Sequence, residues 1–156
     1  MLAHTRQFCT FLLQDYLFGI PVTSVQEVVH HQVITRVPLV SDIVGGLMNL
    51  RGQILMVIDL RRRLQMDKRP PNLPLSNVIV RTDDGLVGLL VDSIGDVVEV
   101  HDCDFENSPI ALASSESGLL VGVYKLACGL MHVLDPIKAC DLSETRDSLE
   151  ESCSTK

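Results

Sequence analysis

An internal repeat constrains the fold of this chain more than any other feature of its sequence. Shifted by 69 positions, the block DYLFGIPVTSVQEVV at 15–29 aligns with DGLVGLLVDSIGDVV at 84–98. Shifted by 76 positions, GLMNLRGQILMVIDLRR at 46–62 aligns with GVYKLACGLMHVLDPIK at 122–138. Because two blocks recur in the same order with nearly equal offsets, the sequence predicts a duplication and therefore two similar β-rich subdomains.

Turn signals between runs of Val, Leu, Ile and Phe predict that most elements are strands. We expect a strand on each side of four turns, at Gln14-Asp15, Arg51-Gly52, Asp84-Gly85 and Cys128-Gly129. The Asp-Gly pair is the strongest of these hairpin signals, because glycine tolerates the backbone angles that tight hairpins need. A further strand is expected in QVITRVPLV at 32–40.

Three short helical segments are expected between the strands. The valines of TSVQEVVHH at 23–31 have helical spacing, and Glu27 follows Ser24 by three positions, as in a capping box. One or two helical turns are expected in DLRRRLQM at 59–66, and a helix begins at 137–140. The prolines of DKRPPNLPLSN at 67–77 predict an irregular connector.

Composition and charge narrow the class of protein. The chain is 46% hydrophobic, so it can bury a core, but it has no run of 18 apolar residues that would span a membrane. Its start lacks the apolar run of a signal peptide, and its five cysteines form no regular pattern, which favours the cytoplasm.

Residues 1–70 carry eight Lys and Arg against five Asp and Glu, and residues 71–156 carry five against fifteen. This balance argues against nucleic-acid binding and allows protein partners of either charge.

No catalytic, metal or cofactor site is predicted. The five histidines stand in no nucleophile motif, and the serines at 114–117 lack a G-x-S-x-G context. Adjacent His30 and His31 would point to opposite faces of a strand, and HDCDFE at 101–106 is most simply a solvated acidic loop. Gly45-Gly46 lacks a phosphate-binding pattern. We therefore expect a non-enzymatic protein.

The two copies of the repeat differ at the Arg51 tip. Arg51 aligns with Ala127 and Asn49 with Lys125, so the common fold does not need these side chains. One interpretation is an exposed turn arginine, with Gly52 supplying a positive φ. The other is a contact to a partner, because arginine pairs with carboxylates in a fork-like geometry at interfaces. The run Arg61-Arg62-Arg63 is interpreted as a solvated helix face.

Four segments in order resemble the CheW family of chemotaxis proteins. NLRGQILMVIDLRRRL resembles the family signature, and FLLQDYLFGIPVTSVQEVV its opening strands. VGLLVDSIGDVVEV resembles its central stretch and LVGVYKLACGLMHVLDPIKAC its closing hairpin and helix. The resemblance implies a mainly β fold of two five-stranded SH3-like β-barrel subdomains around a shared core. Residues 7–142 would form one domain, followed by a polar tail at 143–156.

The resemblance also implies a function and two sets of contact residues. CheW-like proteins are non-catalytic adaptors that couple methyl-accepting chemoreceptors to a CheA-type histidine kinase in the cytoplasm, at membrane-associated receptor arrays. The first subdomain would bind the kinase regulatory domain, and a groove between subdomains would take the helical receptor tip. The implied kinase contacts are Glu27, Arg51 and Ile54. The implied receptor contacts are Val25, Asn49, Arg51, Ser93, Ile94 and Val97. Asp59 and Asp92 would hold strand ends and turns.

Departures from the family pattern leave two alternatives open. Met56 stands where many members have proline, and Ser93 where many have glycine, so the groove and its choice of receptor can differ. One alternative is the same adaptor fold in a chemosensory-like pathway for pilus motility or second-messenger control. The other is a small-molecule or metal sensor that uses the groove or the acidic stretch at 101–106.

Overall fold

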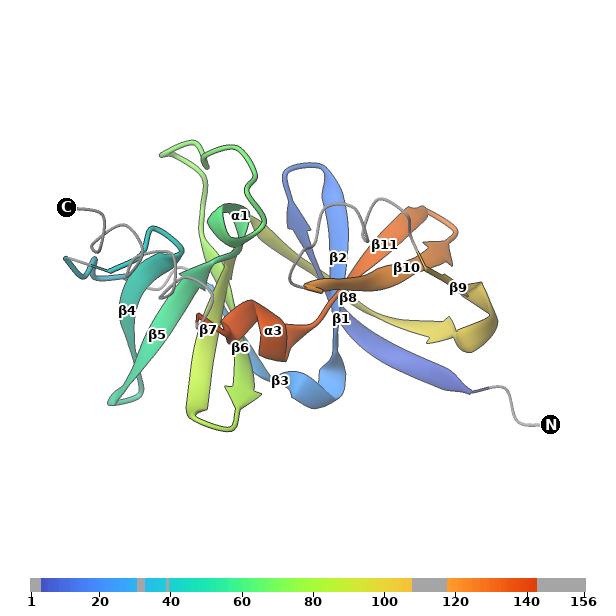
Figure 1. The fold of residues 1–156 in the computed structure, drawn as a ribbon, viewed down its shortest axis with the longest axis horizontal. Coiled ribbons are helices and arrows are strands. Elements are labelled where there is room, and N and C mark those ends of the chain that lie inside the picture. The colour runs from blue at the N-terminus through green and yellow to red at the C-terminus, as the bar shows by residue number, and fades with distance from the viewer. Residues whose placement is uncertain (1–3, 31–32, 39, 108–117, 143–156) are drawn as a thin grey trace, which may run out of the picture.

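The computed structural model describes residues 4–30, 33–38, 40–107 and 118–142, and most of its elements are strands (Figure 1). In chain order the elements are β1 (Thr5–Leu13), β2 (Tyr16–Pro21), the 3-10 helix η1 (Val22–Ser24), β3 (Val25–His30), β4 (Val44–Leu50), β5 (Gln53–Asp59), α1 (Leu60–Arg63), β6 (Ser76–Thr82), β7 (Gly85–Val91), β8 (Ser93–His101), the 3-10 helix η2 (Asp102–Asp104), β9 (Phe105–Glu106), β10 (Leu120–Leu126), β11 (Gly129–Leu134) and α3 (Pro136–Cys140).

The strands form two sheets, which lie side by side along the long axis in Figure 1. One sheet has five strands in the order β3-β6-β7-β5-β4, and the other has six in the order β8-β1-β2-β11-β10-β9. Because β9 is only two residues long, each sheet has five main strands. The prediction of a mainly β fold with two five-stranded units and short helices is confirmed.

The duplication is visible in the bounds of the elements. β4 spans Val44–Leu50 and β10 spans Leu120–Leu126, which is the predicted offset of 76. β2 begins at Tyr16 and β7 at Gly85, which is the predicted offset of 69. Each sheet also contains one parallel pair, β5 with β7 and β11 with β2, at equivalent places. The repeated sequence therefore codes for a repeated order of strands.

The two copies exchange strands, so neither sheet is built from one half of the chain. β3 of the first copy pairs with β6 of the second, and β8 of the second copy pairs with β1 of the first. β8 makes seven register pairs with β1, from Thr5↔His101 to Leu12↔Ser93. The two copies of the repeat are thus linked by backbone hydrogen bonds as well as by side-chain packing.

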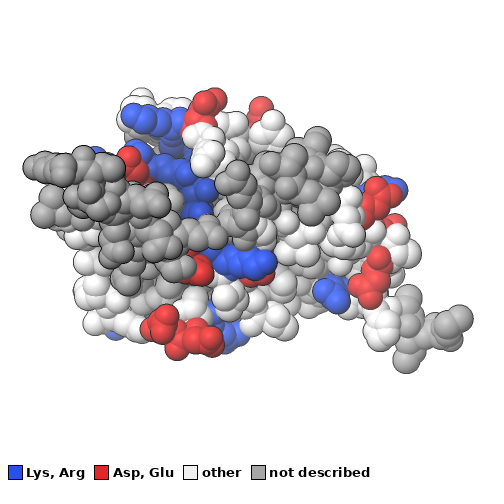
Figure 2. Space-filling view, viewed as in Figure 1, with Lys and Arg blue, Asp and Glu red and all other residues white. Residues whose placement is uncertain are grey.

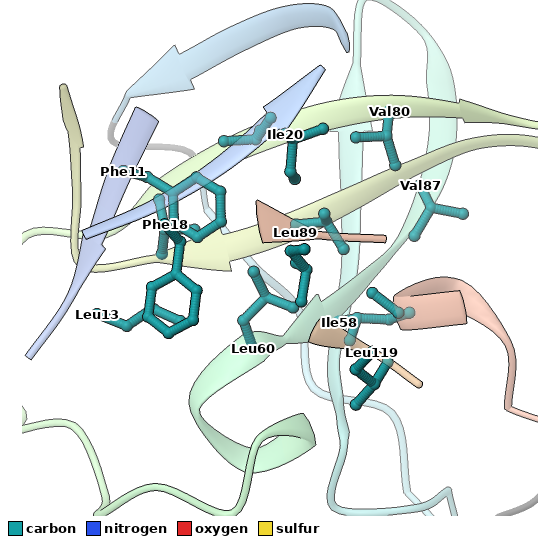
Figure 3. Close-up of a cluster of buried hydrophobic side chains, with 14 residues drawn as sticks. Phe11, Leu13, Phe18, Ile20, Ile58, Leu60, Val80, Val87, Leu89 and Leu119 are labelled. Atoms are coloured by element: carbon teal, nitrogen blue, oxygen red, sulfur yellow. The ribbon is translucent and has the colours of Figure 1, made fainter. Parts of the chain in front are cut away.

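A shared apolar core joins the two sheets (Figure 3). The rings of Phe11 and Phe18 stack with centroids 5.8 Å apart in the six-stranded sheet, and they belong to the same cluster as Ile58 and Leu89 of the other sheet. Two smaller clusters each belong to one sheet. The cluster around Met48 and Val57 packs on the five-stranded sheet, and the cluster around Phe8 and Met131 packs on the six-stranded sheet. Burial of this apolar surface is the main driving force for the fold.

The helix predicted at 23–31 is wrong, because residues 25–30 form strand β3. Burial alternates along Val25–His30 with a period of two, and the strand pairs with β6. The β-branched valines are better suited to a pleated strand than to a helix. The expected capping interaction is absent from the described residues, because Ser24 ends η1 and is followed by a strand rather than a helix.

The strand predicted at 32–40 is reduced to a single bridge in the residues described there. Thr35 exchanges two backbone hydrogen bonds of 2.8 Å with Leu47, and the described residues around Thr35 do not extend this bridge into a ladder.

Two hairpin turns are displaced by one residue from their predicted positions. They lie at Asp83-Asp84 and Ala127-Cys128, because Gly85 and Gly129 are already the first residues of β7 and β11.

Asp92, between β7 and β8, organises a buried ion cluster. Its carboxylate accepts hydrogen bonds from the Gln14 amide at 2.8 Å and from Nε of Arg61 and Arg69, each at 2.9 Å. Burial by itself raises the pKa of Asp92, but these hydrogen bonds outweigh burial and hold the pKa below its ordinary value. The role predicted for Asp92, holding a turn, is confirmed.

Arg61 corrects the expectation of a solvated arginine face at 61–63. It is only 5% exposed, because its guanidinium is neutralised by Asp92. Arg63 also turns inward, and it donates to the carbonyl oxygens of Lys138 and Ala139 at the end of α3. Asp59 accepts from the Arg61 amide at 3.1 Å and so begins α1, as predicted for it.

Candidate functional site

The Arg51 tip is a rigid two-residue turn between β4 and β5. Arg51 has φ 52° and Gly52 has φ 89°, so both residues adopt the left-handed angles of a type I′ hairpin. The side-chain Oδ1 of Asn49 accepts a 2.8 Å hydrogen bond from the Gly52 amide. The tip is therefore fixed by its own backbone and by Asn49, which leaves the Arg51 side chain available for other contacts.

Arg51 forms a two-pronged ion pair with Glu27 of β3. Nη1 donates to Oε1 at 2.8 Å and Nη2 donates to Oε2 at 2.7 Å. β3 and β4 are the two edge strands of the five-stranded sheet, so this pair bridges the ends of the curved sheet. The Arg51 side chain remains 76% exposed, and an ion pair this exposed contributes at most about 1 kcal/mol to folding.

The three predicted kinase contacts lie at one end of the five-stranded sheet. Glu27 and Arg51 contact each other directly, and Ile54 pairs with Asn49 across the hairpin. Ile54 is 60% exposed and is the second residue of β5, just beyond the tip. An exposed aliphatic side chain next to a paired arginine and glutamate combines apolar area with directional polar groups, as protein interfaces do.

The predicted receptor contacts fall into two groups. Val25 and Ile94 are repeat equivalents, and both pack partly buried against the shared core. Ser93 and Val97 are exposed on β8, opposite Leu12 and Cys9 of β1. Among the described residues, no hydrogen bond or ion pair connects β8 to the tip that carries Asn49 and Arg51. Val25, on β3, therefore lies in the same sheet as the tip. Ser93, Ile94 and Val97 lie on β8, in the six-stranded sheet.

Sequence reasoning missed two features of this surface. The first is the pairing of Glu27 with Arg51, which are 24 residues apart and carry no sequence signal of contact. The second is Val28, an exposed valine on β3 that is the repeat equivalent of Val97. Reading residues 25–30 as a strand would have revealed Val28, because alternation places it on the outer face.

The described residues carry few groups arranged for metal binding or thiol chemistry. They contain no group of three or more His, Cys, Asp or Glu side chains placed to hold a metal ion. Burial raises the pKa of the Cys140 thiol to about 12, which keeps it protonated and a poor nucleophile. No helix in the described segments is long and apolar enough to cross a membrane. The serines at 114–117, His31 and the tail at 143–156 lie outside the described residues.

Two strand-exchanged sheets with an exposed, hydrogen-bonded arginine tip define a class of duplicated β-barrel domain. Comparison with known families is specific: the CheW-like domain model matches residues 7–143, and the chain belongs to this family. It is 28% identical over 146 residues to "Chemotaxis protein CheW" of Bacillus subtilis (strain 168), which covers 94% of each chain. It is 28% identical to the protein of the same name from Rhizobium meliloti (strain 1021), over 92% of each chain.

A solved structure supports the same conclusion. The crystal structure of the scaffolding protein TtCheW from Thermoanaerobacter tengcongensis matches with a TM-score of 0.80 at 25% identity. The match covers 90% of this chain and 95% of that chain. The duplicated two-sheet architecture is thus that of the CheW fold.

Proposed function

We propose that this protein is a non-catalytic adaptor that couples methyl-accepting chemoreceptors to a CheA-type histidine kinase in chemotaxis. The observation that carries the proposal is a CheW-like domain over 7–143 that presents the rigid Arg51 tip. The relatives named as chemotaxis proteins and the structural neighbour described as a scaffolding protein support it. Residues 7–142 act as the functional domain, and 143–156 form a polar tail.

The kinase contact is proposed at Glu27, Arg51 and Ile54. Ile54 offers apolar area, and the preformed Arg51–Glu27 pair offers fixed donors and acceptors. Because the hairpin holds the tip before binding, little conformational entropy is lost on association. A partner strand or turn with exposed aliphatic and charged side chains fits this end of the sheet.

The receptor contact is proposed at Val25, Asn49, Arg51, Ser93, Ile94 and Val97. Exposed Val97 and partly buried Val25 and Ile94 suit the apolar face of a helix. Arg51 belongs to both sets, so it stands where the two partners would meet. In this proposal the protein works in the cytoplasm and is recruited to the membrane through the receptors it binds.

Calorimetric titration with the regulatory domain of the host's CheA-type kinase, and separately with a receptor cytoplasmic fragment, tests the proposal. Wild type is expected to bind both. Arg51→Ala is expected to weaken binding by about 1–2 kcal/mol, or by more if Arg51 is an interface hot spot. The matched control is Lys125→Ala, an exposed cation at the equivalent hairpin of the second copy, which is ion-paired with Glu106 at 2.5 Å. Wild type that binds neither partner contradicts the proposal and points to a pathway outside chemotaxis.

A further inference from the structure

A cavity of about 390 Å³ lies away from the proposed interaction site, between α1 and two loop segments. One wall is α1 with the end of β5, another is the segment before β4, and the third is the connector before β6. Five cationic side chains line the cavity: Arg36, Arg61, Arg62, Lys68 and Arg69. Figure 2 shows Lys and Arg atoms gathered over α1 and the connector that follows it.

The cations outnumber the carboxylates that neutralise them. Asp92 binds Arg61 and Arg69, and Asp59 lies 3.5 Å from Nη1 of Arg69. Arg62 lies 3.7 Å from Asp59 and 4.0 Å from the exposed Asp42. In the described part of the chain, neither Arg36 nor Lys68 has a carboxylate partner for its side chain. Five positive charges thus meet three carboxylates, which leaves the cavity electropositive.

One buried donor in the cavity wall has no acceptor. The Arg69 side chain is only 8% exposed, and its Nε and Nη1 are used by Asp92 and Asp59. Its Nη2 is buried and has no hydrogen-bond partner among the described residues. Buried polar groups in folded proteins are nearly always hydrogen-bonded, and the strongest hydrogen bonds of a guanidinium N–H are to anionic oxygens. An acceptor from outside the chain would satisfy it.

Most of the rest of the cavity lining is apolar. It contains Ile34, Val37, Val40, Val44, Leu73 and Leu75, together with two prolines of the connector. A water molecule in the liquid occupies about 30 Å³, so the cavity has room for a small anion and several waters. Such a cavity can hold a charged group against the basic wall and an apolar body against the aliphatic wall.

We propose that this cavity binds a phosphate or a comparable oxyanion group. The anion accepts hydrogen bonds from Arg69 Nη2 and Arg62, and exposed Arg36 and Lys68 close over it at the mouth. Because Nη2 is itself buried, the side chains around Arg69 must move for the anion to reach it. Arginine forks and a lysine point charge are the groups that recognise phosphate in proteins. This site is independent of the proposed adaptor function.

Thermal unfolding in a HEPES buffer tests the proposal, with inorganic phosphate compared against sodium chloride at equal ionic strength. Phosphate is expected to raise the melting temperature progressively with its concentration, because a ligand that binds only the folded state stabilises it. The double variant Arg36→Gln/Lys68→Gln is expected to weaken phosphate binding by about tenfold or more. The control Lys125→Gln, which removes an exposed cation on the other sheet, is expected to keep the full effect.

Amide chemical shifts of the wild-type protein give a second readout that does not depend on any variant. Phosphate is expected to perturb the amides of 34–45 and 61–75. Phenyl phosphate then distinguishes the source of the anion: tighter binding than phosphate indicates an anion on an apolar body, and equal binding indicates free phosphate. The proposal is overturned if chloride stabilises as much as phosphate, or if the perturbed amides lie elsewhere.

Discussion

At the scale of single residues, Arg51 shows how one side chain can be exposed and still well positioned. Its turn is set by two left-handed residues and by the Asn49 side chain, and its guanidinium is oriented by Glu27. Neither arrangement requires burial of the Arg51 side chain. Its loss should therefore matter more to association than to folding.

The first prediction concerns the Glu27–Arg51 pair. In a double-mutant cycle of Glu27→Gln and Arg51→Gln, urea unfolding should give a coupling energy of about 0.5–1 kcal/mol, as for other exposed ion pairs. Salt should reduce this coupling, because the pair is open to solvent. A coupling energy near 3 kcal/mol, or a single variant that fails to fold, would show instead that the pair is structural.

The second prediction concerns His132 of β11, which lies against the rings of Phe18 and Tyr16. Burial lowers the pKa of His132 below its ordinary value of 6.5. The unfolded chain then binds this proton more readily, so the free energy of unfolding is highest above pH 6.5 and falls as the pH drops from 6.5 toward the folded-state pKa. Urea unfolding between pH 5 and 8 should show this slope, and His132→Gln should flatten it. An equal slope in the variant would assign it to other groups.

At the scale of elements, the repeat places an aspartate before each short helix. Asp59 accepts from the Arg61 amide before α1, and Asp135 accepts from the amides of Ile137 and Lys138 before α3. These caps satisfy amides that the first helical turn leaves unpaired. The two sites differ in their surroundings, because Asp59 also neutralises Arg69, whose side chain is nearly buried.

The third prediction compares these two caps. Asp135→Ala should lower the free energy of unfolding by about 1 kcal/mol, the usual value of a lost cap. Asp59→Ala should cost about 2 kcal/mol or more, since it also removes a carboxylate from a nearly buried arginine. Chemical denaturation of both variants would measure the difference. Equal losses would mean that Asp59 contributes nothing beyond its cap.

At the scale of the whole molecule, strand exchange makes the two sheets one folding unit. β3 of the first copy completes the sheet that holds the β6–β7 hairpin of the second copy. β8 of the second copy completes the sheet that holds β1 and β2 of the first. The shared core adds side chains from both sheets to one cluster. Neither half of the chain therefore contains a complete sheet.

The fourth prediction follows from this exchange. Far-UV and near-UV circular dichroism should report one coincident unfolding transition for the whole chain, as expected of a two-state domain. Fragments 1–70 and 71–156 should each lack a cooperative transition when produced alone. Two separate transitions, or a fragment that folds by itself, would contradict the shared core.

Most of the fold was predictable because the repeat and the hairpin turns are local signals. The partners of β3 and β8 were not, because a duplication shows that strands are equivalent without showing which copy each one pairs with. β3 was mistaken for a helix because its three valines have a spacing of three to four, whereas strand alternation places Val28 on the outer face, away from Val25 and Val29. Arg51 could be singled out from the difference between the copies, whereas its contact with Glu27 depends on the curvature of the sheet. The exchange also explains why the β8 contacts belong to a different sheet from the tip.

The most direct test of the adaptor proposal is capture of the kinase regulatory domain by an immobilised receptor fragment, with and without this protein. Capture is expected only when the protein is present, to fall with Arg51→Ala, and to persist with Lys125→Ala. Circular dichroism of both variants would show that the fold is intact. Kinase capture that is the same without the protein, or unchanged by Arg51→Ala in a folded variant, would contradict the coupling role assigned to the tip.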